Sequence, residues 1–154
     1  MGSSSPSEIV SKPLSRVLIA APEDAWSKEA SDALYRAGFV PHRTTTPEAA
    51  TLAVCYRNPS SVLIDSSLIE SAGMRILDAL RMNAPRIPIL VLCRAEDEEL
   101  RLKSLMMGAE DCLVRPFAPQ EVVLRLRRCL ERRKAKLRLV REKDEARERA
   151  EQLR

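Results

Sequence analysis

Aromatic side chains are scarce in this sequence of 154 residues, which has one Trp, two Tyr and two Phe. Proteins that bind single-stranded nucleic acid stack the bases on several aromatic rings, so this composition argues against such a surface. Long apolar runs are missing too. None approaches the roughly 18 residues of a membrane span, and residues 1–14 lack the apolar core of a signal peptide. We therefore expect neither a membrane-spanning segment nor a secretion signal.

The chain contains only four cysteines, and they lie far apart in the sequence. Their spacing matches neither a metal-binding knuckle nor a Cys-x-x-Cys redox pair. The four are Cys55, Cys93, Cys112 and Cys129. Scattered thiols are typical of buried free cysteines in a reducing compartment, so the expected location of the protein is the cytoplasm.

Charge is distributed unevenly along the chain. The formal net charge is +4, from 26 Lys and Arg against 22 Asp and Glu. Residues 133–154 hold nine basic and five acidic residues, which leaves 17 of each sign for the rest. A basic excess suggests an acidic partner such as nucleic acid, but here the whole excess lies at the C-terminal end.

Short apolar runs alternate with amphipathic segments after residue 15. Residues 1–15, rich in Ser and Pro, have no periodicity and are expected to form a disordered leader. Predicted strands lie at residues 17–21, 39–43, 62–64, 87–92 and 112–114. Predicted helices lie at about 24–37, 47–57, 96–107 and 119–154, and a further helix follows Gly73 and includes residues 76–80, with a loop between Asp65 and Gly73. This alternation predicts an α/β fold with a parallel sheet between helices, because βαβ crossovers are right-handed.

Three stretches of the sequence resemble one known family. They are residues 62–65, Val-Leu-Ile-Asp, with Gly73 eight residues on; residues 87–92, Ile-Pro-Ile-Leu-Val-Leu; and residues 108–117, Gly-Ala-Glu-Asp-Cys-Leu-Val-Arg-Pro-Phe. Together they are similar to the receiver domain of two-component response regulators, over about residues 16–132. The resemblance implies a flavodoxin-like (βα)5 fold with strand order 2-1-3-4-5. It also implies phosphorelay signalling, in which a histidine kinase phosphorylates the Asp at the position of Asp65.

The positions around that Asp depart from the family pattern. Ala21 and Pro22 stand where the family has two acids that bind Mg²⁺, and neither side chain offers an oxygen ligand. Cys93 replaces the usual Ser or Thr, and Cys112 replaces the aromatic residue that moves on activation. Arg115 replaces a Lys, so the positive charge is kept on a larger, planar group.

These departures predict an atypical receiver, a pseudo-receiver without enzymatic activity. We expect no cofactor, no Mg²⁺ site and weak or no phosphorylation of Asp65. Arg115, and Arg94 beside it in the fold, are candidates for an ion pair with Asp65. Two alternatives remain: a conventional phospho-accepting receiver that uses Asp65, and a solvated Asp65 without any role.

A dimer interface is implied by the branch of the family that carries winged-helix transcription factors. In that branch the fourth helix, the fifth strand and the fifth helix form the interface. By position, Arg101 would pair with Glu121 and Asp111 with Arg125 across a homodimer, and Met106 would make this face more apolar. The alternative is that these are ordinary surface charges, each pair worth about 0–1 kcal/mol.

The last predicted helix extends well beyond the receiver-like part. Apolar residues recur along it at steps of three and four, and a second stripe follows, which predicts a helical coiled-coil linker over residues 133–154. The first stripe is Val123, Leu126, Leu130, Leu137 and Val140; the second is Leu139, Ala146, Ala150 and Leu153. We expect it to lead to a covalent output domain beyond Arg154, such as a kinase or a nucleotide cyclase. Nucleic-acid binding through this basic tail is a further alternative, against which its five acids argue.

Overall fold

Residues 15–153 are described by the structure, which is a computed structural model. Apart from Ser15, the predicted leader lies outside these residues. The strands are β1 (Arg16–Ala20), β2 (Val40–Thr44), β3 (Ser61–Asp65), β4 (Ile89–Cys93) and β5 (Asp111–Val114). The helices are α2 (Ala25–Arg36), α3 (Pro47–Arg57), α4 (Ser66–Ala72), α5 (Arg75–Asn83), α6 (Glu98–Met106) and α7 (Pro119–Gln152).

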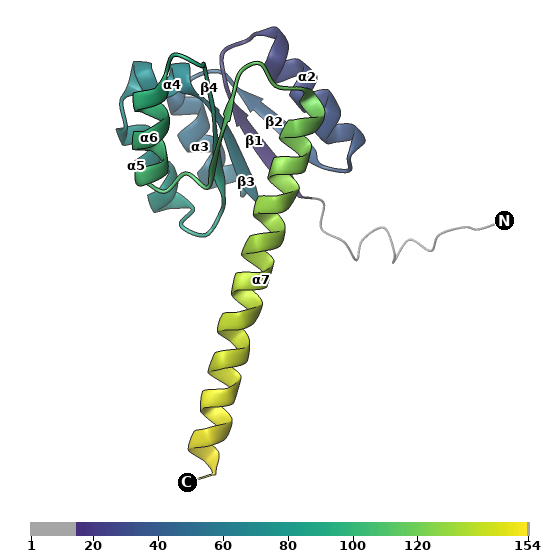
Figure 1. The fold of residues 1–154 in the computed structure, drawn as a ribbon, viewed down its shortest axis with the longest axis vertical. Coiled ribbons are helices and arrows are strands. Elements are labelled where there is room, and N and C mark those ends of the chain that lie inside the picture. Colours follow the sequence, from purple (N-terminus) through teal and green to yellow (C-terminus); the bar gives the residue numbers. More distant parts are fainter. Residues whose placement is uncertain (1–14, 154) are drawn as a thin grey trace, which may run out of the picture.

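The five strands form one parallel sheet in the order β2-β1-β3-β4-β5, which confirms the predicted fold (Figure 1). All five residues of β3 are buried, as expected for a central strand covered on both faces. Because every strand runs in the same direction, the C-terminal ends of all five meet at one edge of the sheet. Asp65 and Cys93 are the last residues of their strands and therefore lie at that edge.

Two apolar clusters cover the two faces of the sheet. On one face, Ile64 and Val91 pack with side chains of α3 and α5, such as Val54 and Leu80. On the other face, inward residues of the same strands pack against α2 and the first turns of α7; examples are Ile19, Leu63, Leu34 and Leu126. This alternation of neighbouring residues between faces is the period of a β-strand. The fold is thus a three-layer sandwich whose helices fix the position of each strand end.

The segment after Asp65 is helical, and the prediction of a loop there was wrong. Asp65 is the N-cap of α4: its Oδ1 accepts a hydrogen bond of 2.8 Å from the backbone N–H of Ser67. Leu68 and Ile69 are buried one turn on and hold α4 against the sheet. Gly73, with a φ of 79° that favours glycine, ends the helix.

Helix α7 begins inside the domain and continues out of it, as Figure 1 shows. Val122, Val123, Leu126 and Cys129 are buried against the sheet. Arg133 makes the last contacts, an ion pair with Glu110 and a hydrogen bond of 3.0 Å to the carbonyl of Arg86. Every described residue from 134 onward is exposed.

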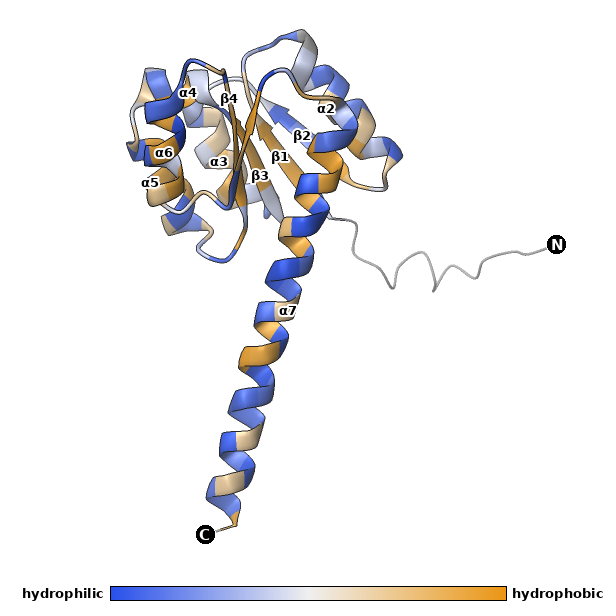
Figure 2. Cartoon of the chain, in the orientation of Figure 1, coloured by the Kyte–Doolittle hydropathy of each residue, from blue (hydrophilic) through white to orange (hydrophobic). Residues whose placement is uncertain are grey.

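The first apolar stripe predicted along α7 is therefore divided in two. Val123 and Leu126 belong to the core of the domain and are not available to a partner helix. Leu137 and Val140 are about half exposed, at 54% and 53%, and form a thin apolar band among hydrophilic residues (Figure 2). In the described part of the chain, no helix combines the length and the apolar character needed to cross a membrane.

Candidate functional site

Asp65 is almost completely buried, and both of its carboxylate oxygens have partners. Oδ2 accepts a hydrogen bond of 2.9 Å from the indole Nε1 of Trp26 and an ion pair from Nη2 of Arg115. Oδ1 accepts the N-cap hydrogen bond from Ser67. The predicted ion pair with Arg115 is thus present, whereas Arg94 is exposed and does not contribute to it.

Arg115 lies directly after β5 and connects three elements. Its Nη2 atom is also 3.9 Å from Oδ2 of Asp24, at the start of α2. Its guanidinium carbon lies 5.6 Å from the centroid of the Trp26 ring, within the range of a cation–π interaction. One third of its side chain remains exposed, although its Nε atom is buried.

Trp26 is the main feature of this site that the sequence analysis missed. Its ring packs edge-to-face on Phe117, with 5.9 Å between the centroids and 77° between the planes. Phe117 lies in the connection from β5 to α7, so this contact joins the start of α2 to the segment that leads into α7. The signal was available: the only Trp of the chain lies in the first turn of a helix that begins at the C-terminal edge of the sheet.

The residues present do not fit a Mg²⁺ site of the kind the family resemblance implies. Ala21 and Pro22 have no side-chain oxygen, and Mg²⁺ requires oxygen ligands in near-octahedral geometry. Glu23 is exposed. Asp24 is the N-cap of α2, with its Oδ1 3.3 Å from the backbone nitrogen of Ser27. Arg115 supplies the positive charge next to Asp65 instead.

Cys93 and Cys112 replace the usual hydroxyl and aromatic residues, and the structure brings them together. Cys93 is buried at the end of β4, and Cys112 is half-buried on β5. The neighbouring Cys112 thiol lowers the pKa of Cys93. The Cys93 thiol, together with burial, raises the pKa of Cys112. The Cys112 Sγ also lies 3.8 Å from the backbone carbonyl oxygen of Arg101 in α6.

The predicted dimer face lies on α6, β5 and α7. Nη1 of Arg125 is 2.9 Å from Oδ2 of Asp111, and Nη2 is 3.7 Å from Oε1 of Glu121, all within the same chain. The Asp111–Arg125 pair, predicted to cross an interface, is therefore an intrachain pair here. Met106 is 87% exposed, and the Arg101 side chain lies on the same helix, α6.

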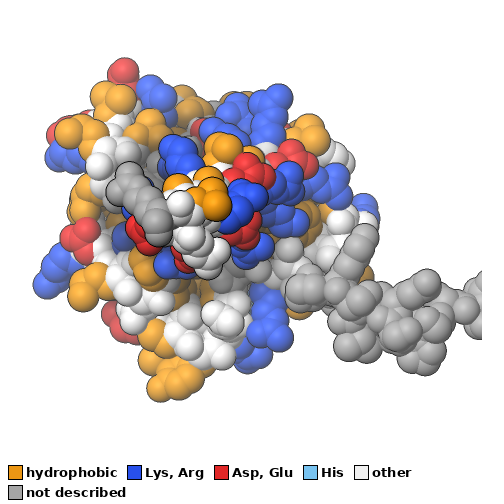
Figure 3. Space-filling model, turned by 90° about the horizontal axis from the view of Figure 1, so that it is seen from below, with side chains coloured by type: hydrophobic (Ala, Val, Ile, Leu, Met, Phe, Trp, Pro, Cys, Tyr) orange, Lys and Arg blue, Asp and Glu red, His pale blue; other side chains and the backbone are white. Residues whose placement is uncertain are grey.

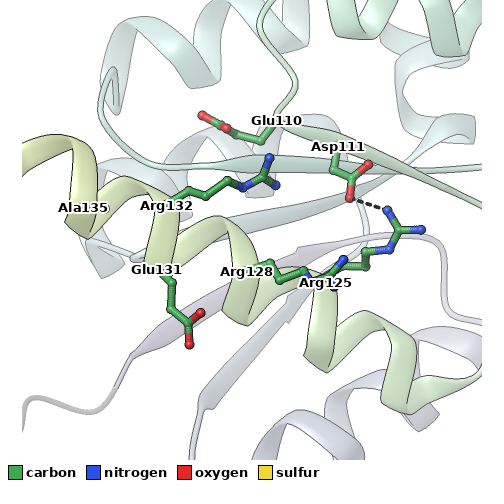
Figure 4. A pocket seen from close by; sticks show the side chains of 7 residues that line it. All are labelled: Glu110, Asp111, Arg125, Arg128, Glu131, Arg132 and Ala135. Carbon is green, nitrogen blue, oxygen red and sulfur yellow. Dashed lines mark hydrogen bonds and ion pairs between the residues drawn. The ribbon is translucent and has the colours of Figure 1, made fainter.

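An open hollow of about 610 Å³ lies beside the Asp111–Arg125 ion pair, between β5 and α7 (Figure 4). Arg125 reaches from α7 to Asp111, whereas Glu131 points away from the strand. The lining residues are Glu110, Asp111, Arg125, Arg128, Glu131, Arg132 and Ala135. Because charges of both signs line it, the hollow could accept a surface that also carries both signs.

The fold, the buried Asp at the end of β3 and the cation after β5 together define a receiver domain. Residues 17–127 match the family described as the response regulator receiver domain, and the chain belongs to this family of two-component signalling proteins. It is 32% identical over 116 residues to the "Probable transcriptional regulatory protein TcrX" of Mycobacterium tuberculosis, covering 75% of this chain and 50% of that protein.

Other relatives agree with this assignment. The transcriptional regulatory protein SrrA of Staphylococcus aureus is 31% identical over 116 residues, covering 75% of this chain and 48% of its own length. The chain thus spans about half the length of the curated relatives it matches. A crystal structure of a CheY-like receiver domain protein from Methanospirillum hungatei has the same fold, with a TM-score of 0.74 at 18% identity over 80% of this chain and 99% of the other.

Proposed function

We propose that this receiver is atypical: it transmits signals through its surfaces and is phosphorylated by Mg²⁺-dependent chemistry weakly or not at all. One observation carries the proposal, namely that Trp26, Ser67 and Arg115 already occupy both oxygens of Asp65. The proposal treats the domain as a non-catalytic module that needs no cofactor.

Phosphorylation of a carboxylate requires one of its oxygens to attack the incoming phosphorus. Asp65 is only 2% exposed, so Arg115 and Trp26 would first have to move away. Removing one partner from a buried ion pair costs several kcal/mol, because the remaining charge is left uncompensated. The product would also carry additional negative charge, and a single guanidinium supplies less countercharge than a divalent cation together with a Lys.

Incubation with acetyl phosphate and Mg²⁺, followed by intact-mass measurement, tests this proposal. We expect little or no phosphorylated wild-type protein, and the variant Asp65→Asn serves as the negative control. The double variant Ala21→Asp with Pro22→Asp is the matched gain-of-function test, since it restores the acid pair. Stoichiometric labelling of wild-type Asp65 would overturn the proposal and favour a conventional receiver.

Membership of the family supports a histidine kinase, or another signalling protein, as the partner. Two relatives are named transcriptional regulators, and each is about twice as long as the part that this chain matches. We propose the same kind of organisation here, with a receiver domain over residues 16–132, a helical linker over 133–154 and a covalently attached output domain beyond it.

A homodimer through α6, β5 and α7 is part of the same proposal. Leu102, Leu105, Met106 and Val114 are exposed apolar residues on this face, where they are surrounded by charges of both signs. A two-fold interface needs such self-complementary charges, because each patch meets its own copy. A dimer would also hold two copies of α7 close to each other, so that even a thin apolar band could pair.

The exposed part of α7 fits a partner helix better than nucleic acid. Seen from below, the molecule presents Lys and Arg mixed with Asp, Glu and apolar side chains, and no basic surface of one sign (Figure 3). The Asp and Glu side chains lie among the Lys and Arg side chains of α7, so they would also face the phosphates of a duplex. Their repulsion would weaken binding. A gel-shift assay with duplex DNA at low and high salt separates the two functions, and salt-sensitive binding would favour nucleic acid.

A further inference from the structure

Cys93 and Cys112 are 19 positions apart in the sequence but adjacent on the sheet. In the parallel ladder between β4 and β5, Cys112 is the partner of Val91, and Cys93 lies two residues farther along β4. Side chains two residues apart on a strand point to the same face. Both cysteines accordingly contact the same apolar cluster, on the face that α3 and α5 cover.

The register also sets the distance between the two backbones. Strands are spaced about 4.8 Å apart and rise about 3.3 Å per residue, which places diagonal neighbours about 8 Å apart between Cα atoms. A disulfide usually joins Cα atoms about 4.4–6.8 Å apart. The two strand ends therefore have to approach each other by more than about 1 Å before the bond can form, and the resulting strained bond would be easily reduced.

We propose that Cys93 and Cys112 form a reversible intrachain disulfide when the protein meets a peroxide. The thiolate that the pair forms attacks a peroxide oxygen; the O–O bond breaks, hydroxide leaves, and a sulfenic acid forms on that sulfur. The thiol of the other cysteine then attacks the oxidised sulfur, and its proton leaves with the sulfenic hydroxyl group as water. In total, two thiols and one hydrogen peroxide give one disulfide and two waters.

The two thiols influence each other, which supports their reaction as a pair. The Cys112 thiol lowers the pKa of Cys93, so Cys93 is the member of the pair that forms the thiolate more readily. Cys93 is completely buried, so the sulfur of the neighbouring Cys112 is the one that lies within its reach. Of the other two cysteines, Cys55 is exposed on α3, and Cys129 is buried in the cluster on the opposite face of the sheet.

Disulfide formation would alter the face proposed for dimerisation. The Cys112 Sγ contacts the Arg101 carbonyl in α6, and Cys112 follows Asp111 on β5. Drawing Cys112 toward β4 removes this contact and shifts both elements of the face. This inference does not rest on the proposed dimer, because the bond can form in a monomer.

Peptide mapping of the whole chain tests the proposal directly. The reduced protein is treated with hydrogen peroxide, free thiols are blocked with iodoacetamide, and the protein is digested with trypsin without reduction. We expect a cross-linked species that joins residues 87–94 to residues 104–125, with the mass of the two peptides less two hydrogen atoms. Dithiothreitol should restore the separate peptides.

Two single variants complete the design. Cys112→Ser, at the half-buried position, should abolish the cross-link, whereas Cys55→Ser, at an exposed position on another element, should leave its yield unchanged. The proposal is overturned if the treated wild type contains Cys93 and Cys112 only as separate alkylated or sulfinic peptides. A main cross-link through Cys55 or Cys129 would overturn it as well.

Discussion

Asp65–Arg115 and Asp111–Arg125 are ion pairs at opposite ends of β5, and they lie in very different surroundings. Asp65 pairs with Arg115, which follows the strand, and the Asp65 side chain is only 3% exposed. Asp111, the first residue of β5, pairs with Arg125, and these two side chains are 22% and 39% exposed. The same two chemical groups should therefore contribute differently to stability and to signalling.

Burial decides which of the two pairs can exchange its partner. Asp65 is enclosed by Trp26 and by the N-terminus of α4, so breaking its pair leaves a carboxylate without water. Arg125 already shares its guanidinium between Asp111 and Glu121, and water can replace either of them. The first pair fixes the site, and the second can reorganise when another molecule binds.

The largest effect is expected when Arg115 is removed. Arg115→Ala should lower the free energy of unfolding by about 2–4 kcal/mol, less than for a fully buried pair because one third of Arg115 is exposed. Urea denaturation measures the loss. In an Asp65→Asn background, where no buried charge is left behind, the same change should cost clearly less. Equal losses in both backgrounds would show that the loss does not come from leaving the buried Asp65 carboxylate unpaired.

Reversing the charge of Arg101 should weaken the proposed dimer. With two symmetry-related contacts of about 0.5–1 kcal/mol each, Arg101→Glu should raise the dimer dissociation constant about five- to thirtyfold. Sedimentation equilibrium measures the constant. The combination with Glu121→Arg swaps the charges and should recover most of the affinity. An unchanged sedimentation profile in the single variant would count against this interface.

A smaller effect is expected when the indole donor to Asp65 is lost. Trp26→Phe keeps an aromatic ring against Phe117 but removes the N–H group, so unfolding should become easier by about 1–2 kcal/mol. Tyr35→Phe, on the exposed side of the same helix, is the matched control and should change stability by less than about 0.5 kcal/mol. Similar losses of stability in the two variants would mean that the hydrogen bond from Trp26 to Asp65 does not contribute to the free energy of unfolding.

The smallest effect is expected at the exposed pair. Arg125→Ala should change the free energy of unfolding by about 0–1 kcal/mol, and the difference should shrink as salt is added. Thermal denaturation at low and high ionic strength measures both quantities. A loss as large as that of Arg115→Ala would remove the distinction between the buried and the exposed pair.

The sequence predicted the sheet well because its apolar runs are uninterrupted. The runs that became β1, β3 and β4 are buried on both faces. A short, continuous apolar run in a small α/β domain is typical of a central parallel strand. Strand order and the position of Asp65 followed from the family resemblance. The predicted strand boundaries differ from the observed ones by at most two residues, since strand ends depend on hydrogen bonds between strands.

The errors have a different physical origin. Helix α4 is stabilised by Asp65 as its N-cap, a capping role that was not considered for Asp65 in the sequence. The first apolar stripe of α7 was assigned to a coiled coil, although Val123 and Leu126 face the sheet. Trp26 and the Cys93–Cys112 contact depend on which side chains the tertiary fold brings together, and spacing along the chain does not contain that information.

Trp26 gives the protein a built-in optical probe. It is the only tryptophan of the chain, and its indole touches the carboxylate of Asp65, the guanidinium of Arg115 and the ring of Phe117. Its fluorescence therefore originates entirely from the closed site. Any event that moves one of these three groups changes the surroundings of the emitting ring, so the state of Asp65 can be followed in real time without a label.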